Sequence, residues 1–337
     1  LPAKFVERVL RELGPDEGGA LCRALTGEPS VSVRLNAAKG LAAPSGRPIG
    51  WSSGGYWLDA RPSFTLDPDF HAGRYYVQEA SSQFVGHIVA ACGGIRGGRV
   101  LDLCAAPGGK TTLYSTLAGR GGLVVANEIV RNRAAVLADN VRKWGVGNVA
   151  VTVNDPSQVA RLEGWFDAVA VDAPCSGEGM FRKLEEARTE WSEAGVALCA
   201  ERQRGILREA WRTLRPGGLL LYSTCTFNFT ENEGVLRDFS VWAAGETEPA
   251  ERIAVDPAWG VVCGAEGDFQ TFRFYPHKVE GEGFFAAAVR KRAAGGDGGE
   301  AVGAVVDHRT GNTLVQQQHG RVHPQLRVPE NMAVVPL

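Results

Sequence analysis

The sequence lacks the features of membrane, secreted and zinc-binding proteins. No apolar run approaches the roughly 20 residues that a membrane-spanning helix needs. The first five residues, Leu1-Pro2-Ala3-Lys4-Phe5, carry no signal-peptide pattern. No Cys-x-x-Cys pair occurs among the seven cysteines, so neither a zinc ribbon nor a thioredoxin-type motif is indicated, and we expect no metal site. An odd number of cysteines without paired spacing favours reduced thiols in a cytoplasmic protein with no membrane partner.

An excess of positive charge is also missing. The 36 basic and 38 acidic residues give a formal charge of −2 at pH 7, whereas nucleic-acid-binding proteins normally present a basic surface to the phosphates. The basic residues are nevertheless clustered in three places: Arg182-Lys183, five arginines between Arg202 and Arg215, and Arg290-Lys291-Arg292. Charge balance alone therefore neither supports nor excludes an RNA partner.

The chain has 337 residues, enough for two domains, and residues 1–73 are predicted to form a small α+β domain. Apolar residues from Phe5 to Leu13 follow helical spacing, and Gly14-Pro15 ends that helix before a second short one. Alternation over Val31–Leu35 predicts a strand, and the Gly-, Pro- and Ser-rich stretch 44–68 predicts hairpins and loops.

The next part of the chain, 74–292, shows buried strands alternating with helices. This pattern predicts a Rossmann-like α/β domain whose mostly parallel sheet is covered on both faces. The predicted strands are Val100–Cys104, Leu123–Asn127, Val149–Val153, Ala168–Asp172 and Leu219–Ser223, and the predicted helices are Lys110–Leu117, Asn132–Trp144 and Leu198–Leu214. Two later apolar runs, Thr271–Tyr275 and Phe284–Val289, are expected to complete the sheet as an antiparallel edge pair. Residues 293–337 begin with a Gly- and Ala-rich stretch that is a flexible linker by composition.

The segment from Leu101 to Thr112 combines a strand, a glycine-bearing turn and a helix, which predicts a ligand-binding loop. Its small residues let a ligand approach the backbone, and free N–H groups at the helix N-terminus attract an anion. Three ligands compete. Gly109-Lys110-Thr111 fits the end of a phosphate-binding loop, but Cys104 stands where that loop has its first glycine. The Gly-x-Gly-x-x-Gly fingerprint of dinucleotide folds is absent; the third candidate is S-adenosyl-L-methionine.

Acidic residues after three successive predicted strands favour this third candidate. Glu128 follows the second strand, where an acid can accept hydrogen bonds from both ribose hydroxyls. Asp155 follows the third strand, in a position to meet the adenine amino group, and Asp172 ends the fourth. One such acid alone could be a helix cap or a turn former. Three of them at the edge where such sheets bind ligands suit a neutral nucleoside joined to a sulfonium cation, and they would repel a triphosphate.

Two cysteines follow predicted strands at that same edge, which suggests covalent chemistry. They lie in Asp172-Ala173-Pro174-Cys175-Ser176-Gly177 and in Ser223-Thr224-Cys225-Thr226-Phe227. A thiolate that adds to C6 of a pyrimidine makes C5 nucleophilic, so that C5 can take a methyl group before a base removes its proton. Asp172 is the candidate to hydrogen-bond N3 and the exocyclic amine of that base.

Packing accounts for four of the other cysteines, which we expect to be small buried hydrophobes: Cys22, Cys92, Cys199 and Cys263. Cys225 differs, because a capping-box pattern, Thr230-Glu231-Asn232-Glu233, predicts a helix directly after it and packing alone would not require a thiol there. The residues alone do not say which of the two thiols attacks.

Three motifs together resemble those of the Sun-family RNA (cytosine-5)-methyltransferases. They are Cys104–Lys110, Asp172–Lys183 and Ser223–Glu233. The Gly-Met-Phe-Arg-Lys extension at Gly179–Lys183 resembles the bacterial 16S ribosomal RNA branch, the RsmF type. The resemblance covers roughly Leu1 to Arg292, with Tyr75–Ser82 similar to the family's entry into its catalytic domain.

The resemblance implies a role for each matching residue. Cys225 would be the nucleophile, Cys175 would help to release the product, and Asp172 would act in both catalysis and cofactor binding. The other implied contacts to S-adenosyl-L-methionine are Cys104, Ala105, Ala106, Pro107, Gly108, Gly109, Lys110, Glu128 and Asp155. Arg182 and Lys183 are candidate RNA contacts, with residues 1–73 as an RNA-recognition domain. Trp51, Trp57, Tyr75 and Tyr76 could stack on bases, but we expect core packing for them.

The expected function is methyl transfer to C5 of cytidine in RNA, most simply 16S ribosomal RNA or the small ribosomal subunit, by a monomer. Two alternatives stay open: the same chemistry on transfer RNA, and a ribosome assembly factor that holds the cofactor without turnover. Family members of the RsmF type continue into a C-terminal RNA-binding domain of the PUA kind. Residues 293–337 are too few for a complete one, so we expect a linker and a truncated extension there.

Overall fold

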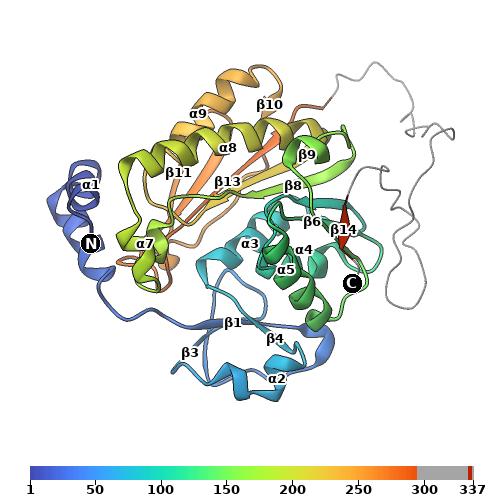
Figure 1. Cartoon of the computed structure of the whole chain (residues 1–337), viewed down its shortest axis with the longest axis horizontal. Helices are drawn as coiled ribbons and strands as arrows, with labels where there is room; N and C mark the ends of the chain where they lie inside the picture. The colour runs from blue at the N-terminus through green and yellow to red at the C-terminus, as the bar shows by residue number, and fades with distance from the viewer. Residues whose placement is uncertain (294–332, 336–337) are drawn as a thin grey trace.

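The computed structural model describes residues 1–293 and 333–335 (Figure 1). Its centre is a ten-stranded sheet in the order β11-β12-β13-β9-β8-β5-β6-β7-β14, with β10 paired to β13. The strands are β5 (Arg99–Asp102), β6 (Leu123–Asn127), β7 (Val149–Thr152), β8 (Phe166–Asp172), β9 (Leu214–Thr224), β10 (Thr247–Glu248), β11 (Val262–Glu266), β12 (Phe269–Phe274), β13 (Phe284–Lys291) and β14 (Val334–Val335).

The middle of this sheet is parallel, which confirms the predicted Rossmann-like α/β fold. Strands β7, β6, β5, β8 and β9 run parallel to one another, and β13, β12 and β11 continue the sheet antiparallel. The predicted antiparallel pair is therefore present as β12 and β13. It is not the edge, however, because β11 pairs outside β12.

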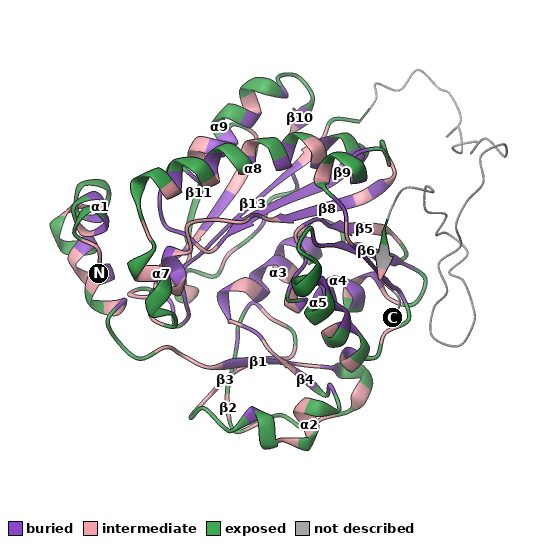
Figure 2. Cartoon of the chain, in the orientation of Figure 1, coloured by how far each residue is buried: buried purple, intermediate pink, exposed green. Residues whose placement is uncertain are grey.

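Helices cover both faces of the sheet, because alternate strand residues are apolar on both sides. Helices α3 (Phe84–Ala91), α4 (Gly109–Ala118) and α5 (Arg131–Trp144) pack with Val124 and Ala126, whereas α8 (Glu193–Thr213) and α9 (Glu233–Trp242) share the opposite core with Val125 (Figure 2). Two short helices, α6 (Pro156–Val159) and α7 (Glu185–Thr189), lie in connections. No helix in the described ranges is long and apolar enough to cross a membrane.

Two local predictions differ from the structure. Residues 215–218 are predicted as a turn after α8, but they lie within β9. They interrupt its pairing with β8, because the register between the two strands shifts between Leu214 and Leu219. Helix α9 begins at Glu233 without a side-chain cap. The predicted capping box is wrong because the carboxylate of Glu233, its fourth residue, instead accepts hydrogen bonds from Arg273.

The N-terminal region forms one kinked helix and a small sheet. Helix α1 (Ala3–Ala24) kinks at Gly14, where the sequence predicts a break, because Pro15 follows and the Gly14 φ is 81°. The antiparallel sheet has the order β2-β3-β1-β4. Its strands are β1 (Ser32–Leu35), β2 (Gly46–Pro48), β3 (Gly55–Leu58) and β4 (Tyr75–Val77), and α2 (Pro68–His71) precedes β4.

This region shares its core with the large sheet. Trp51 is 5% exposed and packs edge-on against Trp259 and Phe274, and Tyr75 is 7% exposed, so core packing is confirmed for both. Strand β4 pairs with β1 and extends the small sheet beyond residue 73, where the sequence predicts the domain to end. Most of the predicted linker and extension, 294–332 and 336–337, lies outside the described residues, and β14 pairs antiparallel with β7.

Candidate active site

Cys175 and Cys225 meet at the carboxyl edge of the parallel sheet. Strands β8 and β9 are parallel neighbours whose register pairs Asp172 with Ser223, so the loops after them run side by side. Cys175 Sγ lies 3.3 Å from Cys225 Sγ, and both are free thiols. Gly179 donates its N–H to the carbonyl of Cys225 at 2.9 Å, and a Cβ at this position would lie 2.5 Å from the Gly283 carbonyl oxygen and 3.0 Å from that of Cys225. The close approach of the two loops therefore favours glycine at this position.

Two buried glutamates connect the loops that carry Cys175 and Cys225, and each accepts hydrogen bonds from the backbone of the other loop. Glu178, on the Cys175 loop, accepts the backbone N–H groups of Phe227 and Asn228 at 2.9 and 3.1 Å. Glu231, on the Cys225 loop, accepts the N–H of Ser176 at 2.9 Å. The side chain of Asn228 donates to both carboxylates, and both glutamates are 0% exposed. We call Glu178, Glu231 and Asn228 the glutamate clamp, because they fix the position of one thiol relative to the other.

Helix α1 supplies the counter-charge for this clamp. Arg8 Nη2 lies 2.5 Å from Glu178 Oε1, and the side chains are 9% and 0% exposed. Trp191 Nε1 donates to the same carboxylate oxygen at 3.0 Å. Because α1 reaches the loops that carry the thiols, it contributes to the site as well as to the N-terminal region.

The pair of thiols is arranged so that one proton is held on Cys175. The hydrogen bond to Cys225 is the largest cause that raises the pKa of Cys175 well above its usual range, and burial adds to it. A protonated Cys175 can therefore donate its S–H to the Cys225 sulfur across the 3.3 Å contact.

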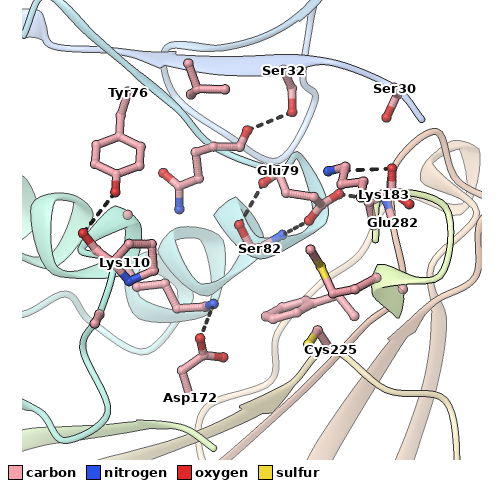
Figure 3. A pocket seen from close by; sticks show the side chains of 18 of the residues that line it. Ser30, Ser32, Tyr76, Glu79, Ser82, Lys110, Asp172, Lys183, Cys225 and Glu282 are labelled. Atoms are coloured by element: carbon pink, nitrogen blue, oxygen red, sulfur yellow. Dashed lines mark hydrogen bonds and ion pairs between the residues drawn. The ribbon is translucent and has the colours of Figure 1, made fainter. Parts of the chain in front are cut away.

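Lys110 and Asp172 form an ion pair beside Cys225 (Figure 3). Lys110 Nζ lies 2.8 Å from Asp172 Oδ2, and Ser223 Oγ donates to Oδ1 at 2.7 Å. Burial is the largest effect on Lys110 and acts to lower its pKa, but the Asp172 carboxylate outweighs it and the pKa is raised overall. The Lys110 ammonium also lies 5.1 Å from the ring centroid of Phe284. A charged pair with an aromatic neighbour is thus held next to the thiol.

Two cavities meet at these groups. The Glu128 cavity, of about 730 Å³, contains Glu128, Asp155, Asp172 and both thiols. The Lys110 cavity, of about 380 Å³, is shown in Figure 3 and contains Lys110, Asp172 and Cys225. The walls that they share are Cys104, Ala106, Asp172 and Cys225. Cys225 is thus accessible from both cavities, whereas Cys175 lines only the Glu128 cavity.

The predicted cofactor residues divide between the cavities. Cys104 and Ala106 line both, whereas Ala105, Pro107, Gly109 and Lys110 line only the Lys110 cavity. Gly108 lines neither cavity. Glycine is favoured at this position because its φ is 112° and a Cβ would lie 3.0 Å from the Leu137 side chain. Asp155 also caps α6, accepting the Ser157 N–H, so capping and cavity lining are combined in one residue.

Glu128 and Asp102 are the most deeply buried acids that line the two cavities. Glu128 is 2% exposed and its Oε1 accepts the N–H of Val130, which leaves Oε2 to face Arg133 at 3.4 Å. Asp102 is 1% exposed, and among the described residues its Oδ1 has no hydrogen-bond partner. Burial raises the pKa of Asp102 to about 7, although Thr111 donates to its Oδ2 at 2.6 Å.

Asp102 was missed at the level of the sequence, although it lines the Lys110 cavity. It ends β5, so the rule that selects Asp172 at the end of β8, an acid at the carboxyl end of a parallel strand, would have found it. The glutamate clamp and Arg8 had no comparable local signal.

The predicted RNA contacts have different surroundings. Arg182 is bound inside the protein, because Nε donates to Glu282 at 2.8 Å and Nη1 and Nη2 donate to the carbonyls of Glu28 and Gly281. Since its side chain is only 9% exposed, we do not retain Arg182 as a phosphate contact. Lys183 lies 3.6 Å from Glu282 and lines the Lys110 cavity, so it stays a candidate.

The other basic clusters are largely neutralised by ion pairs. Arg204, Arg212, Arg215 and Arg290 each contact a carboxylate within 2.6 Å. These arginines therefore do not form an unpaired basic surface.

The remaining cysteines only partly follow the prediction. Cys92 is buried, Cys22 and Cys199 are half-buried, and Cys263 is exposed. The expectation for Cys263 is wrong because it lies on β11, the outer strand, where the Cys263 side chain is not covered. Within the described ranges, no group of three or more His, Cys, Asp or Glu side chains could hold a metal ion.

Comparison with known proteins identifies relatives for almost the whole described chain. Residues 95–290 match the family model of 16S rRNA methyltransferase RsmB/F, and residues 1–80 match the N-terminal domain of 16S rRNA methyltransferase RsmF. The ribosomal RNA small subunit methyltransferase F of Erwinia tasmaniensis is 38% identical over 257 residues, which cover 73% of this chain and 52% of the relative. The chain thus spans about half the length of the curated relatives it matches.

Solved structures have the same fold. The structure of PH0851 superposes with a TM-score of 0.75 at 30% identity, covering 86% of this chain and 66% of that one. A methyltransferase homologue from Pyrococcus horikoshii gives a TM-score of 0.65 at 27% identity, covering 86% of this chain and 100% of that one. Because a family model matches more than half of its length, the chain belongs to the RsmB/F family of 16S rRNA methyltransferases.

Proposed function

We propose that this protein transfers a methyl group from S-adenosyl-L-methionine to C5 of cytidine in RNA, with Cys225 as the covalent nucleophile. The observation that carries the proposal is the 3.3 Å contact between two thiols at the junction of two cavities. One cavity has the acids that a nucleoside cofactor needs, and the other has space for a base beside Cys225. Family membership supports the same chemistry.

The Glu128 cavity is assigned to the cofactor because its side chains fit that molecule. Glu128 and Asp155 stand at the carboxyl ends of neighbouring parallel strands, where acids can accept hydrogen bonds from ribose and adenine. Its lining has four acids against two arginines, Arg133 and Arg202, and this excess of negative charge disfavours a triphosphate. When bound there, S-adenosyl-L-methionine would supply an electrophilic methyl group on a sulfonium.

The Lys110 cavity is assigned to the target cytosine. Asp172, held by Lys110 and Ser223, can accept a hydrogen bond from the exocyclic amine of the base. The Cys225 thiolate then forms a bond to C6, which places electron density on C5 for attack on the methyl group. A C6–S bond forms at the start of the reaction and breaks at its end, so Cys225 is regenerated.

Cys175 is assigned to product release. In the free protein its proton is held chiefly by the hydrogen bond to Cys225. Once the Cys225 sulfur is bonded to C6 it accepts a hydrogen bond more weakly, so the largest cause of the raised Cys175 pKa is weakened. Cys175 can then lose its proton to solvent and take the proton from C5, and the electron pair of the C5–H bond expels the Cys225 thiolate.

The RNA substrate is proposed as 16S ribosomal RNA, either free or in the small subunit. The relatives that match this chain carry that substrate in their names. A protein of this fold must receive an extruded or unpaired base, which costs a few kcal/mol for a stacked base. Transfer RNA and an assembly factor without turnover are the alternatives that the experiment must separate.

In the test, the full chain is incubated with methyl-labelled S-adenosyl-L-methionine and one of three substrates: 16S ribosomal RNA, small subunits or transfer RNA. The nucleosides of each RNA are then analysed. We expect 5-methylcytidine in 16S ribosomal RNA or the subunit and none in transfer RNA. Label in transfer RNA alone would reassign the substrate. Cofactor binding without label in any RNA would support the assembly factor and overturn the proposed reaction.

A further inference from the structure

A third cavity lies between the small sheet and α5, next to the Lys110 cavity. Its volume is about 330 Å³, which is within the size of small-ligand sites. Its lining comprises Arg61, Phe64, Thr65, Phe70, Gly73, Tyr75, Tyr76, Val77, Asn140, Lys143 and Trp144. We call it the Phe70 cavity.

The chemistry of the Phe70 cavity differs from that of the other two. None of its lining residues is acidic, whereas the Lys110 and Glu128 cavities each have four carboxylates in their walls. Five of the lining residues are aromatic, and Phe70 and Tyr76 are only half-buried. The Tyr75 hydroxyl donates to Asp67, so one carboxylate is close to a ring, but none lines the cavity. Flat rings in a wall without carboxylates suit a nucleobase, because every base has a face that stacks on them.

Two cations border these rings. Lys143 Nζ lies 4.1 Å from the Phe70 ring centroid, and the Arg61 guanidinium lies 5.4 Å from that of Phe64. Within the described ranges neither has an ion pair, unlike Arg204 and Arg212 of α8. Cations that contact rings but no carboxylate are free to neutralise a phosphate.

The Phe70 cavity adjoins the Lys110 cavity and shares part of its wall. Arg61, Tyr76 and Val77 line both. The hydroxyl of Tyr76, which is labelled in Figure 3, donates to the Pro107 carbonyl at 3.1 Å. The Asn140 amide donates to that hydroxyl at 3.3 Å. The Tyr76 ring is thus fixed between the two cavities.

We infer that the Phe70 cavity binds a nucleotide of the RNA adjacent to the target cytidine, with its base on Phe70 and its phosphate near Lys143. This rests on the proposed function in one respect, that RNA is the substrate placed in the Lys110 cavity. A target base there leaves its neighbour at the shared wall, where Arg61 meets the phosphate that joins the two nucleotides. Stacking of this neighbour would offset part of the cost of extruding the target.

The experiment measures the dissociation constant of a 12-nucleotide uridine-rich RNA with a single central cytidine, with S-adenosylhomocysteine present. The full chain is compared with Phe70→Ala, Phe70→Leu and Lys143→Ala. Since stacking on one aromatic side chain contributes 5- to 150-fold in affinity, as an order of magnitude, we expect both Phe70 variants to bind about tenfold or more weakly. Phe70→Leu keeps an apolar side chain, so it controls for loss of packing with Phe64 and Tyr75.

Lys143→Ala should lower the slope of log affinity against log salt by about one, as expected for one lost phosphate contact. The matched control is Arg120→Ala. Arg120 is exposed and precedes β6, at the opposite end of the parallel strands, so this variant should bind like the unchanged protein.

An abasic neighbour distinguishes base stacking from phosphate contact. RNA that lacks the bases on either side of the cytidine should lose affinity for the unchanged protein but not for Phe70→Leu. Equal binding by the folded Phe70 variants, with methyl transfer to 16S ribosomal RNA by the unchanged protein, would overturn this inference while leaving the proposed function. If the unchanged protein neither binds nor methylates RNA, both fail.

Discussion

Replacing Arg8 by methionine should destabilise the protein and slow catalysis, although Arg8 lies on α1 and far from the thiols in sequence. Its guanidinium is the cation beside Glu178, whose carboxylate is fully buried. Methionine keeps most of the apolar length of the side chain and removes the charge. The carboxylate would then be left in the interior without its counter-charge.

The expected cost follows from that burial. Removing one partner of a buried ion pair costs about 3–5 kcal/mol in free energy of unfolding. The carboxylate also holds the backbone N–H groups of Phe227 and Asn228, which follow Cys225 closely in the chain. A displacement of a reacting group by about 1 Å can cost 10²-fold in rate, so we expect kcat to fall by about ten- to a hundredfold while KM for RNA changes little.

Urea unfolding followed by tryptophan fluorescence measures the first effect, and single-turnover methyl transfer measures the second. Arg11→Met, at an exposed position on the same helix, is the matched control and should stay within about 0.5 kcal/mol of the unchanged protein. In the double variant Arg8→Met/Glu178→Gln, the loss should be smaller than the sum by about 1–3 kcal/mol. An Arg8→Met protein with unchanged stability and unchanged kcat would refute the role of the glutamate clamp.

Three further predictions concern acids and the lysine of the cavities. The pKa of Asp102 is raised to about 7 in the folded state, so between about pH 4 and pH 7 Asp102 is protonated in the folded protein but ionised in the unfolded chain. The free energy of unfolding therefore falls as the pH rises through this range, by about 4 kcal/mol in total. Asp102→Asn should abolish this loss in melting curves between pH 5 and 8, and a steeper loss would contradict it. Lys110→Met leaves Asp172 without its cation and should lower kcat/KM by roughly 10²–10³-fold; a change below threefold would argue against the pair. Glu128→Gln weakens charge-assisted bonds to ribose, so calorimetry should show cofactor binding weaker by about 10–100-fold with RNA affinity retained, and unchanged cofactor affinity would place the nucleoside elsewhere.

The parallel sheet and its ligand edge could be predicted because their signals are local. Apolar runs such as Leu123–Asn127 mark buried strands, and an acid after each run marks the edge where ligands bind. Glu128, Asp155 and Asp172 could therefore be placed together from the sequence, and they line one cavity.

The residues that escaped prediction depend on contacts between distant segments. Arg8 and Glu178 are 170 positions apart, and nothing in an amphipathic helix indicates which of its charges is buried against another segment. Glu233 has a capping-box spacing to Thr230, but its carboxylate is bound by Arg273, 40 positions along the chain. Arg182 is a basic residue of the kind that binds RNA phosphates, yet its N–H groups are hydrogen-bonded to Glu282 and to two backbone carbonyls.

The most direct test of the central claim is a search for a covalent protein–RNA complex on a denaturing gel, confirmed by mass spectrometry. Cys175→Ser incubated with 16S ribosomal RNA and S-adenosyl-L-methionine should accumulate the complex, because Cys225 still attacks C6 and release is blocked. Cys225→Ala and the double variant Cys175→Ser/Cys225→Ala should form none and transfer no methyl group. A complex that forms through Cys175, or full methyl transfer by Cys225→Ala, would contradict the assignment of Cys225 as the nucleophile.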